Sequence, residues 1–276
     1  MPVRVTSLDD RRISLVLEGY SLAFANALRR LALSDVPSMA VDFALFYDNS
    51  TSIYDEIIAH RLGLTVLSSD EAIHKYRPPE ECKGREPPAP DCYVELLLEV
   101  EHPEDAATGR YVKAGEIKTS DPLVKPVYEE TPILYLAPGQ KIHLIAYARL
   151  GRGREHAKWS PASVSILQYM PRVRILDSDL GEECRQCIQA YREILEAADK
   201  GESEVIYESN VNTSGLNYCA STVCAGKLSL EYAKDTYILT VESNGSLRPE
   251  KIVYEAARSL KDRANKLVQA LAALRG

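Results

Sequence analysis

The chain has 276 residues, 45% of them hydrophobic, and a formal net charge of −7. This length suits about two domains, no apolar run approaches the roughly 18 residues of a membrane helix, and the first ten residues lack the apolar core of a signal peptide. A protein that binds nucleic acid by itself usually carries a basic face, because neutralising phosphates dominates that affinity. We therefore expect a cytoplasmic protein that does not read DNA sequence and whose partners are other proteins.

The amino-terminal part of the chain predicts a strand followed by an amphipathic helix. Apolar residues alternate along residues 13–17, as they do in a half-buried strand. Ser21 is a favourable N-cap for a helix that runs to about Leu33. The apolar residues of this helix recur at steps of three and four and form one stripe: Phe24, Ala27, Leu28 and Leu31. Pro37 follows the helix, and the residue before a proline avoids the helical conformation.

The middle of the chain predicts a mainly β region. Alternating apolar residues predict strands over residues 41–47, 93–100 and 142–150. A short helix is expected at residues 53–62, directly after the first of these strands. Residues 77–91 are rich in proline, glutamate and glycine, and they predict an exposed loop that connects two pieces of sheet.

The last third of the chain predicts short helices, a hairpin and one long helix. The segment from Gly181 to about Lys200 has a polar helical pattern. Two alternating runs within residues 228–241 predict a hairpin that turns at Lys234 and Asp235. From about Pro249 apolar residues recur at steps of three and four, which predicts a helix of about 26 residues, or near 39 Å. Its stripe is almost heptad-like, which is typical of a helix that packs against another helix.

Four stretches of sequence resemble the alpha-type subunits of DNA-directed RNA polymerases, in the order in which that family carries them. They read FANALRRLALSDVP at residues 24–37, SMAVD and YDEIIAHRLGL within residues 38–64, HAKWSP at residues 156–161, and VESNGS at residues 241–246 before the long helix. The chain is similar above all to the archaeal alpha-like (D-type) subunits and to the third-largest subunit of eukaryotic polymerase II. Because the four stretches span nearly the whole chain, the resemblance is specific.

The resemblance implies an α+β fold with a discontinuous dimerisation domain. Residues 1–45 and 226–276 would form that alpha-type domain from the two ends of the chain. Residues 46–165 would form an inserted, mainly β domain, and residues 166–225 a small cysteine-bearing insertion, which is ferredoxin-like in some archaeal relatives.

The resemblance also implies a non-catalytic assembly subunit. Its partner would be the small alpha-like subunit L, and the pair would recruit the small subunits N and P and the second-largest subunit. The first and last helices would form the dimer interface, through Phe24, Ala27, Leu28, Leu31, Val253, Leu260, Leu267 and Leu271. Arg29 and Arg30 are the candidates for contact with a large subunit, because arginines bind carboxylates in a bidentate manner. No catalytic residue is expected, since the catalytic aspartates and their magnesium belong to the largest subunit.

Four cysteines, Cys184, Cys187, Cys219 and Cys224, lie where some archaeal relatives carry an iron–sulfur cluster. Four thiolates suit a 3Fe-4S or 4Fe-4S cluster or a zinc ion. The chain lacks the compact C-x2-C-x2-C run of bacterial ferredoxins, and two pairs about thirty residues apart fit two disulfides or free thiols equally well. A stand-alone iron–sulfur redox protein is therefore the alternative function.

Cys82 and Cys92 bracket the proline-rich loop, and they are candidates for a disulfide or for two reduced thiols. Asn and Gln together number only 12, which is typical of thermophilic proteins. Intracellular disulfides are common in hyperthermophiles, so a disulfide is compatible with a cytoplasmic location.

His156, Lys158 and Trp159 resemble a set of reactive groups. The sequence places no pair of nucleophile and base beside them, so we expect structural or contact residues.

Overall fold

The computed structural model describes residues 2–208 and 211–274 of the chain. The chain divides into two compact units, each made from two stretches of sequence. Unit 1 comprises residues 1–29 and 165–241, and unit 2 comprises residues 30–164 and 242–276. Antiparallel sheets and helices occur in both, as the α+β expectation requires.

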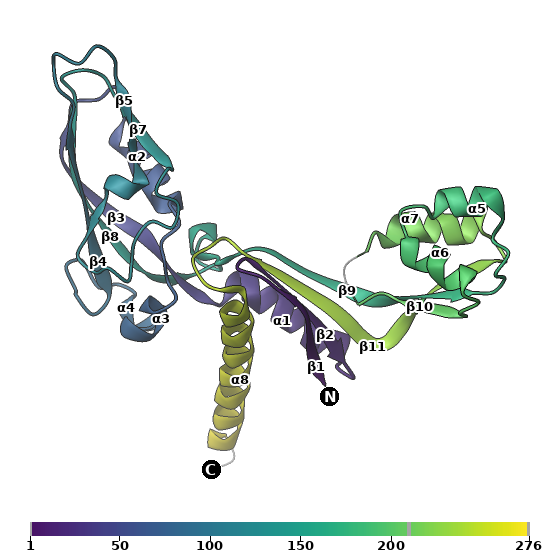
Figure 1. Ribbon diagram of the computed structural model, residues 1–276. Coiled ribbons are helices and arrows are strands. Elements are labelled where there is room, and N and C mark those ends of the chain that lie inside the picture. The colour runs from purple at the N-terminus through teal and green to yellow at the C-terminus, as the bar shows by residue number, and fades with distance from the viewer. Residues whose placement is uncertain (1, 209–210, 275–276) are drawn as a thin grey trace. The chain divides into compact units, whose positions relative to one another are not determined.

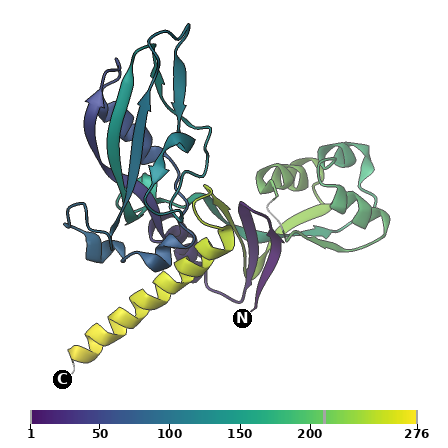
Figure 2. The same cartoon turned by 60° about the vertical axis from the view of Figure 1, so that its left-hand side comes forward.

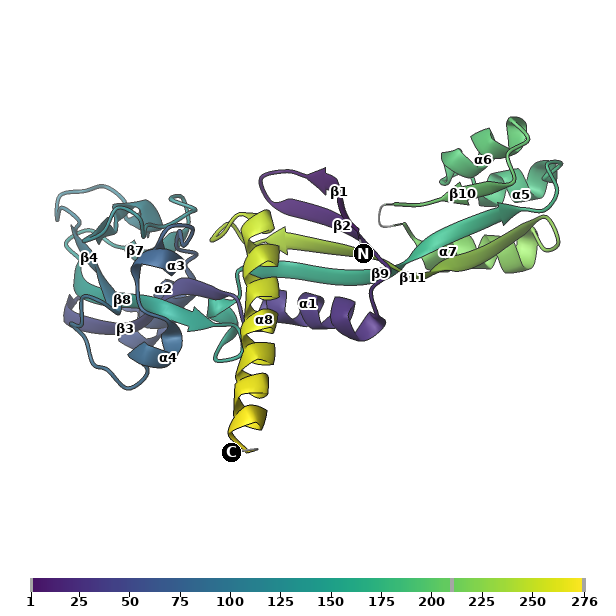
Figure 3. The same ribbon diagram turned by 90° about the horizontal axis from the view of Figure 1, so that it is seen from below.

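Unit 1 is built on a five-stranded sheet with the strand order β1-β2-β11-β9-β10. Its strands are β1 (Val3–Leu8), β2 (Arg12–Glu18), β9 (Ala162–Ile175), β10 (Glu204–Ile206) and β11 (Leu228–Ser243). Its helices are the first part of α1 (Leu22–Ser34), α5 (Gly181–Cys187), α6 (Arg192–Asp199), α7 (Thr213–Tyr218) and the π-helical turn η3 (Cys219–Val223). Figure 3 shows α5, α6 and α7 gathered around the far ends of β9 and β11. The apolar residues of that helical group form a core of their own.

Unit 2 contains a four-stranded sheet with the strand order β3-β8-β4-β6 and a separate β5–β7 pair. Its strands are β3 (Pro37–Asn49), β4 (Tyr93–Glu101), β5 (Arg110–Lys113), β6 (Lys118–Thr119), β7 (Pro132–Leu136) and β8 (Lys141–Arg152). Its helices are α2 (Asp55–Leu64), α3 (Ala72–Lys75), α4 (Pro79–Cys82), α8 (Pro249–Ala273) and the 3₁₀ turns η1 (Ala114–Glu116) and η2 (Ala157–Trp159).

The core of unit 2 lies on one face of the four-stranded sheet. Figure 1 shows α2 and the β5–β7 pair on that side. Ile58 and Leu62 of α2 are buried there against Leu96 and Leu98 of β4 and Leu144 of β8. The opposite face carries a smaller cluster in which the loop that Cys82 and Cys92 close packs against two tyrosines.

The predicted hairpin at residues 228–241 is wrong, because β11 runs through it as one strand of 16 residues. Asp235 is the reason, since its φ of 50° places one residue in the left-handed conformation without reversing the chain. The carbonyl of Asp235 accepts a hydrogen bond from the backbone of Gly19 at 2.8 Å. Apolar residues occupy even positions before this kink and odd positions after it, a change of phase that a single irregular residue produces.

Candidate subunit interface

The apolar stripe of α1 divides into a buried part and an exposed part. Leu28 and Leu31 are buried within the chain itself, and Ala27 is half-buried. Phe24 is exposed near the start of the helix, where its ring stacks on Tyr20 with the centroids 4.8 Å apart. Helical periodicity placed all four residues on one face, but it does not distinguish side chains that pack on their own chain from side chains available to a partner.

The two adjacent arginines of α1 differ in their surroundings. The Arg29 guanidinium donates a hydrogen bond through Nε to the Asn26 side chain at 2.9 Å and is half-buried. Arg30 is exposed. The structure therefore fixes the direction of Arg29 and leaves Arg30 on the surface.

The long helix α8 is packed at its beginning and exposed at its end. Pro249, Ile252 and Ala256 are buried in unit 2, and Val253 and Leu260 are half-buried. Every described residue of 261–274 is exposed, and Figure 2 shows this part of the helix extending away from the sheets of unit 2. The apolar side chains of this end are 52–83% exposed: Leu267, Val268, Leu271 and Leu274. A stripe of this kind, with no cover in its own unit, is typical of a helix that packs against a partner.

Asp35, directly after α1, joins three segments of unit 2 through one buried carboxylate. Its side chain is only 5% exposed and accepts a hydrogen bond from the Ser34 hydroxyl at 2.6 Å. Arg154, from the loop after β8, approaches the same carboxylate at 3.2 Å, and Arg263 of α8 forms an ion pair with it. The guanidinium of Arg152 donates to the Asp35 backbone carbonyl. Asp35 therefore anchors α8 four turns from its start.

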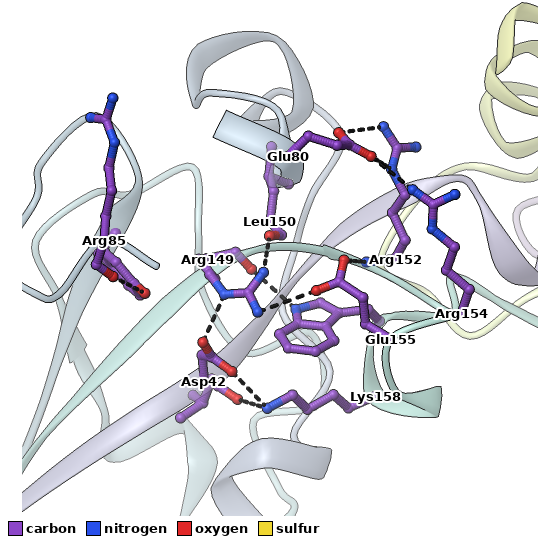
Figure 4. A network of polar contacts seen from close by, with 12 residues as sticks. Asp42, Glu80, Arg85, Arg149, Leu150, Arg152, Arg154, Glu155 and Lys158 are labelled. Atoms are coloured by element: carbon purple, nitrogen blue, oxygen red, sulfur yellow. Dashed lines mark hydrogen bonds and ion pairs between the residues drawn. The ribbon is translucent and has the colours of Figure 1, made fainter. Parts of the chain in front are cut away.

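Glu80 of α4 extends this network on the other side of the arginines. Its carboxylate binds Arg152 at 2.7 Å and Arg154 at 2.9 Å (Figure 4). The hydrogen bond from Arg152 lowers the pKa of Glu80 and outweighs the opposing effect of its partial burial. These groups border a cleft of about 530 Å³ whose lining carries equal numbers of basic and acidic residues. The basic residues are Arg152, Arg154, Arg258, Arg263 and Lys266, and the acidic residues are Asp35, Glu80, Glu81, Glu255 and Asp262.

The HAKWSP stretch forms a second polar cluster in unit 2, around the buried ring of Trp159. Arg149 and Lys158 each lie over this ring, at 4.4 Å and 4.2 Å from its centroid. The carboxylate of Asp42 binds both cations, Arg149 at 2.7 Å and Lys158 at 3.3 Å (Figure 4). Trp159 Nε1 donates to the backbone carbonyl of Arg149 at 3.2 Å. His156 Nδ1 accepts from the backbone of Lys158, so these residues have structural contacts that hold η2 against β3 and β8.

The six cysteines form three disulfides. One bridge joins Cys82 to Cys92 and closes the proline-rich loop. The other two join Cys184 to Cys224 and Cys187 to Cys219, and both connect α5 to η3 and the turn that follows it. The four sulfur atoms of these two bridges therefore lie between the same two segments. Reduction of both disulfides would turn them into four thiols, which could bind a metal as thiolates. In the described residues no group of three or more His, Cys, Asp or Glu side chains is arranged to hold a metal ion.

Sequence reasoning did not find Asp35, Glu80 or Asp42 as organising residues. Each is a common acidic residue in sequence, and its arginine and lysine partners lie between 72 and 228 positions away. Among the described residues no helix is long and apolar enough to cross a membrane.

Comparison with known proteins identifies the family. The model of the RNA polymerase Rpb3/Rpb11 dimerisation domain matches residues 14–264. The chain is 51% identical to DNA-directed RNA polymerase subunit Rpo3 of Aeropyrum pernix, over 98% of this chain and 94% of that protein. It is 35% identical to the Rpo3 subunit of Pyrococcus horikoshii, over 99% of each chain, and 30% identical to that of Methanothermobacter thermautotrophicus, over 97% and 98%. The names of these archaeal relatives give no support to a stand-alone iron–sulfur protein. The chain belongs to the RNA polymerase Rpb3/Rpb11 dimerisation-domain family.

Proposed function

We propose that the chain is a non-catalytic assembly subunit of an archaeal DNA-directed RNA polymerase. It forms a heterodimer with the small alpha-like subunit L, and the pair recruits subunits N and P and the second-largest subunit in the cytoplasm. The observation that carries this proposal is the exposed apolar stripe on residues 261–274 of α8. The names of the relatives and the dimerisation domain of the family support it.

The proposed interface uses the exposed members of the two stripes first. Leu267 and Leu271 of α8 and Phe24 of α1 have side chains that a partner can reach directly. Leu28 and Leu31 are buried in the chain's own core, so they position α1 for the interface and do not contact the partner directly. Arg29 and Arg30 are assigned to the later contact with a large subunit.

Co-expression with subunit L tests the heterodimer. We expect a one-to-one complex in size-exclusion chromatography with light scattering. Leu271→Asp should prevent it, because pairing would bury an unpaired carboxylate. Gln269→Asp is the matched control, since it adds the same charge to the same exposed turn about 160° around the helix from Leu271. A wild-type chain that stays monomeric beside L would refute the proposal.

The arginine pair is tested on the assembled heterodimer. Arg29→Ala with Arg30→Ala should leave the heterodimer intact and reduce incorporation of the second-largest subunit during reconstitution. If these substitutions break the heterodimer itself, the proposed division between the two interfaces is wrong.

We further propose that Cys184, Cys187, Cys219 and Cys224 act as structural disulfides in the mature protein. The two bridges tie α5 to η3 and the turn after it, and all four cysteines pack in the apolar core of this helical group. Iron, acid-labile sulfide and zinc should be measured per chain on the heterodimer purified without oxygen. Three or four irons with matching sulfide, or one zinc, would replace the disulfide proposal with a metal site.

A further inference from the structure

The outer face of the four-stranded sheet in unit 2 is apolar along β3. Phe43, Leu45 and Tyr47 alternate along this strand and are 48%, 40% and 59% exposed. Their neighbours across the sheet extend the apolar row, since Leu45 lies opposite Ile145 of β8, which lies opposite Leu97 of β4. Sheets that are apolar on both faces are normally covered on both.

Cover for this face is incomplete among the described residues of unit 2. The main core occupies the other face, under α2 and the β5–β7 pair. On the outer face, the loop closed by Cys82 and Cys92 packs on Tyr93 and Tyr147, and Ile145 lies at the edge of this small cluster. The side chains of β3 remain outside it, and β3 is the edge strand of the sheet.

A small pocket of about 140 Å³ lies around the edge of β3, and its lining is partly apolar and partly polar. The polar part consists of Asp42, His60, His156 and Lys158. Phe43 belongs both to the outer face and to the lining of this pocket. Ala59 and Leu64 of α2 line its other side, and Leu64 is itself half-exposed. The pocket has the size of one aliphatic side chain.

The charged residues of β4 beside the apolar row are acidic, and one cation, Lys118 of β6, lies opposite Leu97 on the same face. Glu95 and Glu99 of β4 are exposed on the outer face, where they lie opposite Tyr147 and His143 of β8. Within the described part of the chain neither carboxylate has an ion-pair partner, whereas Glu80 and Glu116 of the same unit are paired with arginines. Unpaired carboxylates that border an apolar surface favour a partner with lysine or arginine at the matching positions.

From this arrangement we propose that the outer face of β3, β8 and β4 docks an amphipathic helix of another polymerase subunit. The apolar stripe of that helix covers Phe43, Leu45 and Tyr47, one of its side chains fills the pocket beside Leu64, and basic residues on one flank meet Glu95 and Glu99. A helix suits this position because helices cover the apolar faces of sheets and one helix spans adjacent strands at once. This inference rests on the proposed function, because it takes the partner helix from another polymerase subunit. The docking surface itself is separate from the apolar stripe of α8.

The test uses the full-length heterodimer with L, reconstituted with a defined set of the remaining polymerase subunits. A photo-crosslinking amino acid at position 47 should join one of those subunits at a segment that has helical apolar spacing and flanking lysines or arginines. A crosslink to a second copy of this chain, a crosslink to an acidic segment, or no crosslink in assembled polymerase would overturn the proposal.

Variants separate this surface from the dimer interface. Leu45→Asp, and Glu95→Lys combined with Glu99→Lys, should each leave the heterodimer intact and lower incorporation into polymerase on the order of tenfold in competition with the wild type. The loss from the charge reversal should shrink as salt rises, because exposed charges are screened. Tyr111→Asp, at another exposed aromatic residue of unit 2, is the matched control and should compete as the wild type does. Incorporation of Leu45→Asp at the wild-type level would overturn this inference. Failure of the wild-type chain to form the heterodimer would refute the proposed function instead.

Discussion

Removing the carboxylate of Asp35 should detach α8, beyond its first two turns, from the rest of unit 2. Asp35→Ala deprives Arg154 and Arg263 of their shared acid and Ser34 of its acceptor. Removing one member of a fully buried ion pair costs about 3–5 kcal/mol. Arg154 and Arg263 are 47% and 49% exposed, so water screens much of this effect, as it does in exposed pairs worth about 0–1 kcal/mol each. We therefore expect unit 2 to lose roughly 1–3 kcal/mol of unfolding free energy.

The fluorescence of Trp159 provides the assay, because it is the only tryptophan and it lies in unit 2. Denaturant unfolding followed at this residue should shift to a lower midpoint, and amide hydrogen exchange along α8 should become faster beyond its first two turns. Asp35→Asn keeps one acceptor oxygen and should lose less. Asp262→Ala, which removes an exposed acid next to Arg263, is the matched control. If the control shifts the midpoint as far as Asp35→Ala, or if exchange in α8 is unchanged, Asp35 is not the anchor.

Three further predictions concern the other contacts of unit 2. Gly151→Ala should lower the stability of unit 2 by roughly 1–3 kcal/mol in the same fluorescence assay, because a Cβ there would lie 2.2 Å from the Trp159 ring. Replacing Cys82 and Cys92 together by serine should cost up to about 3 kcal/mol on the loop-entropy model, and a dithiol reductant should have this effect on the wild type and not on the double variant. Burial raises the pKa of Asp121, but hydrogen bonds from a lysine and a tyrosine outweigh it and hold the pKa below the ordinary 3.8. The stability contributed by this carboxylate is therefore complete above pH 3.8 and is lost as the pH falls further, so Asp121→Asn should unfold less steeply than the wild type in an acid titration.

The sequence predicted the helices and strands whose pattern is local. Alternation and helical spacing located β2, α1, β3 and α8, since burial on one face imposes a period that is visible in a short window. The hairpin prediction failed at Asp235, which has a left-handed backbone conformation. The apolar residues shift from even to odd positions there, and in the sequence such a shift looks the same as a turn. Such a residue is not distinguishable from a turn without its partner strand.

The candidate site was predicted only in part, because exposure depends on distant segments. Leu28 and Leu271 have equivalent positions in their apolar stripes, yet one is buried and the other is 52% exposed. The same limit applies to the polar residues. Asp35 pairs with an arginine 228 positions away, and nothing in the sequence near either residue indicates the pair.

The polar network explains how α8 keeps an apolar stripe exposed. A helix with four exposed apolar residues at its end would gain by folding back onto its own unit, since each buried side chain contributes about 1.5–3 kcal/mol. The surface beside α8 is the charged cleft around Glu80 and Arg152, however, and covering it would bury those charges. Lys251 binds Asp70 and Arg263 binds Asp35, which holds the helix at both ends of its packed half. The last three turns therefore extend beyond the final anchor, and the stripe stays available for a second chain.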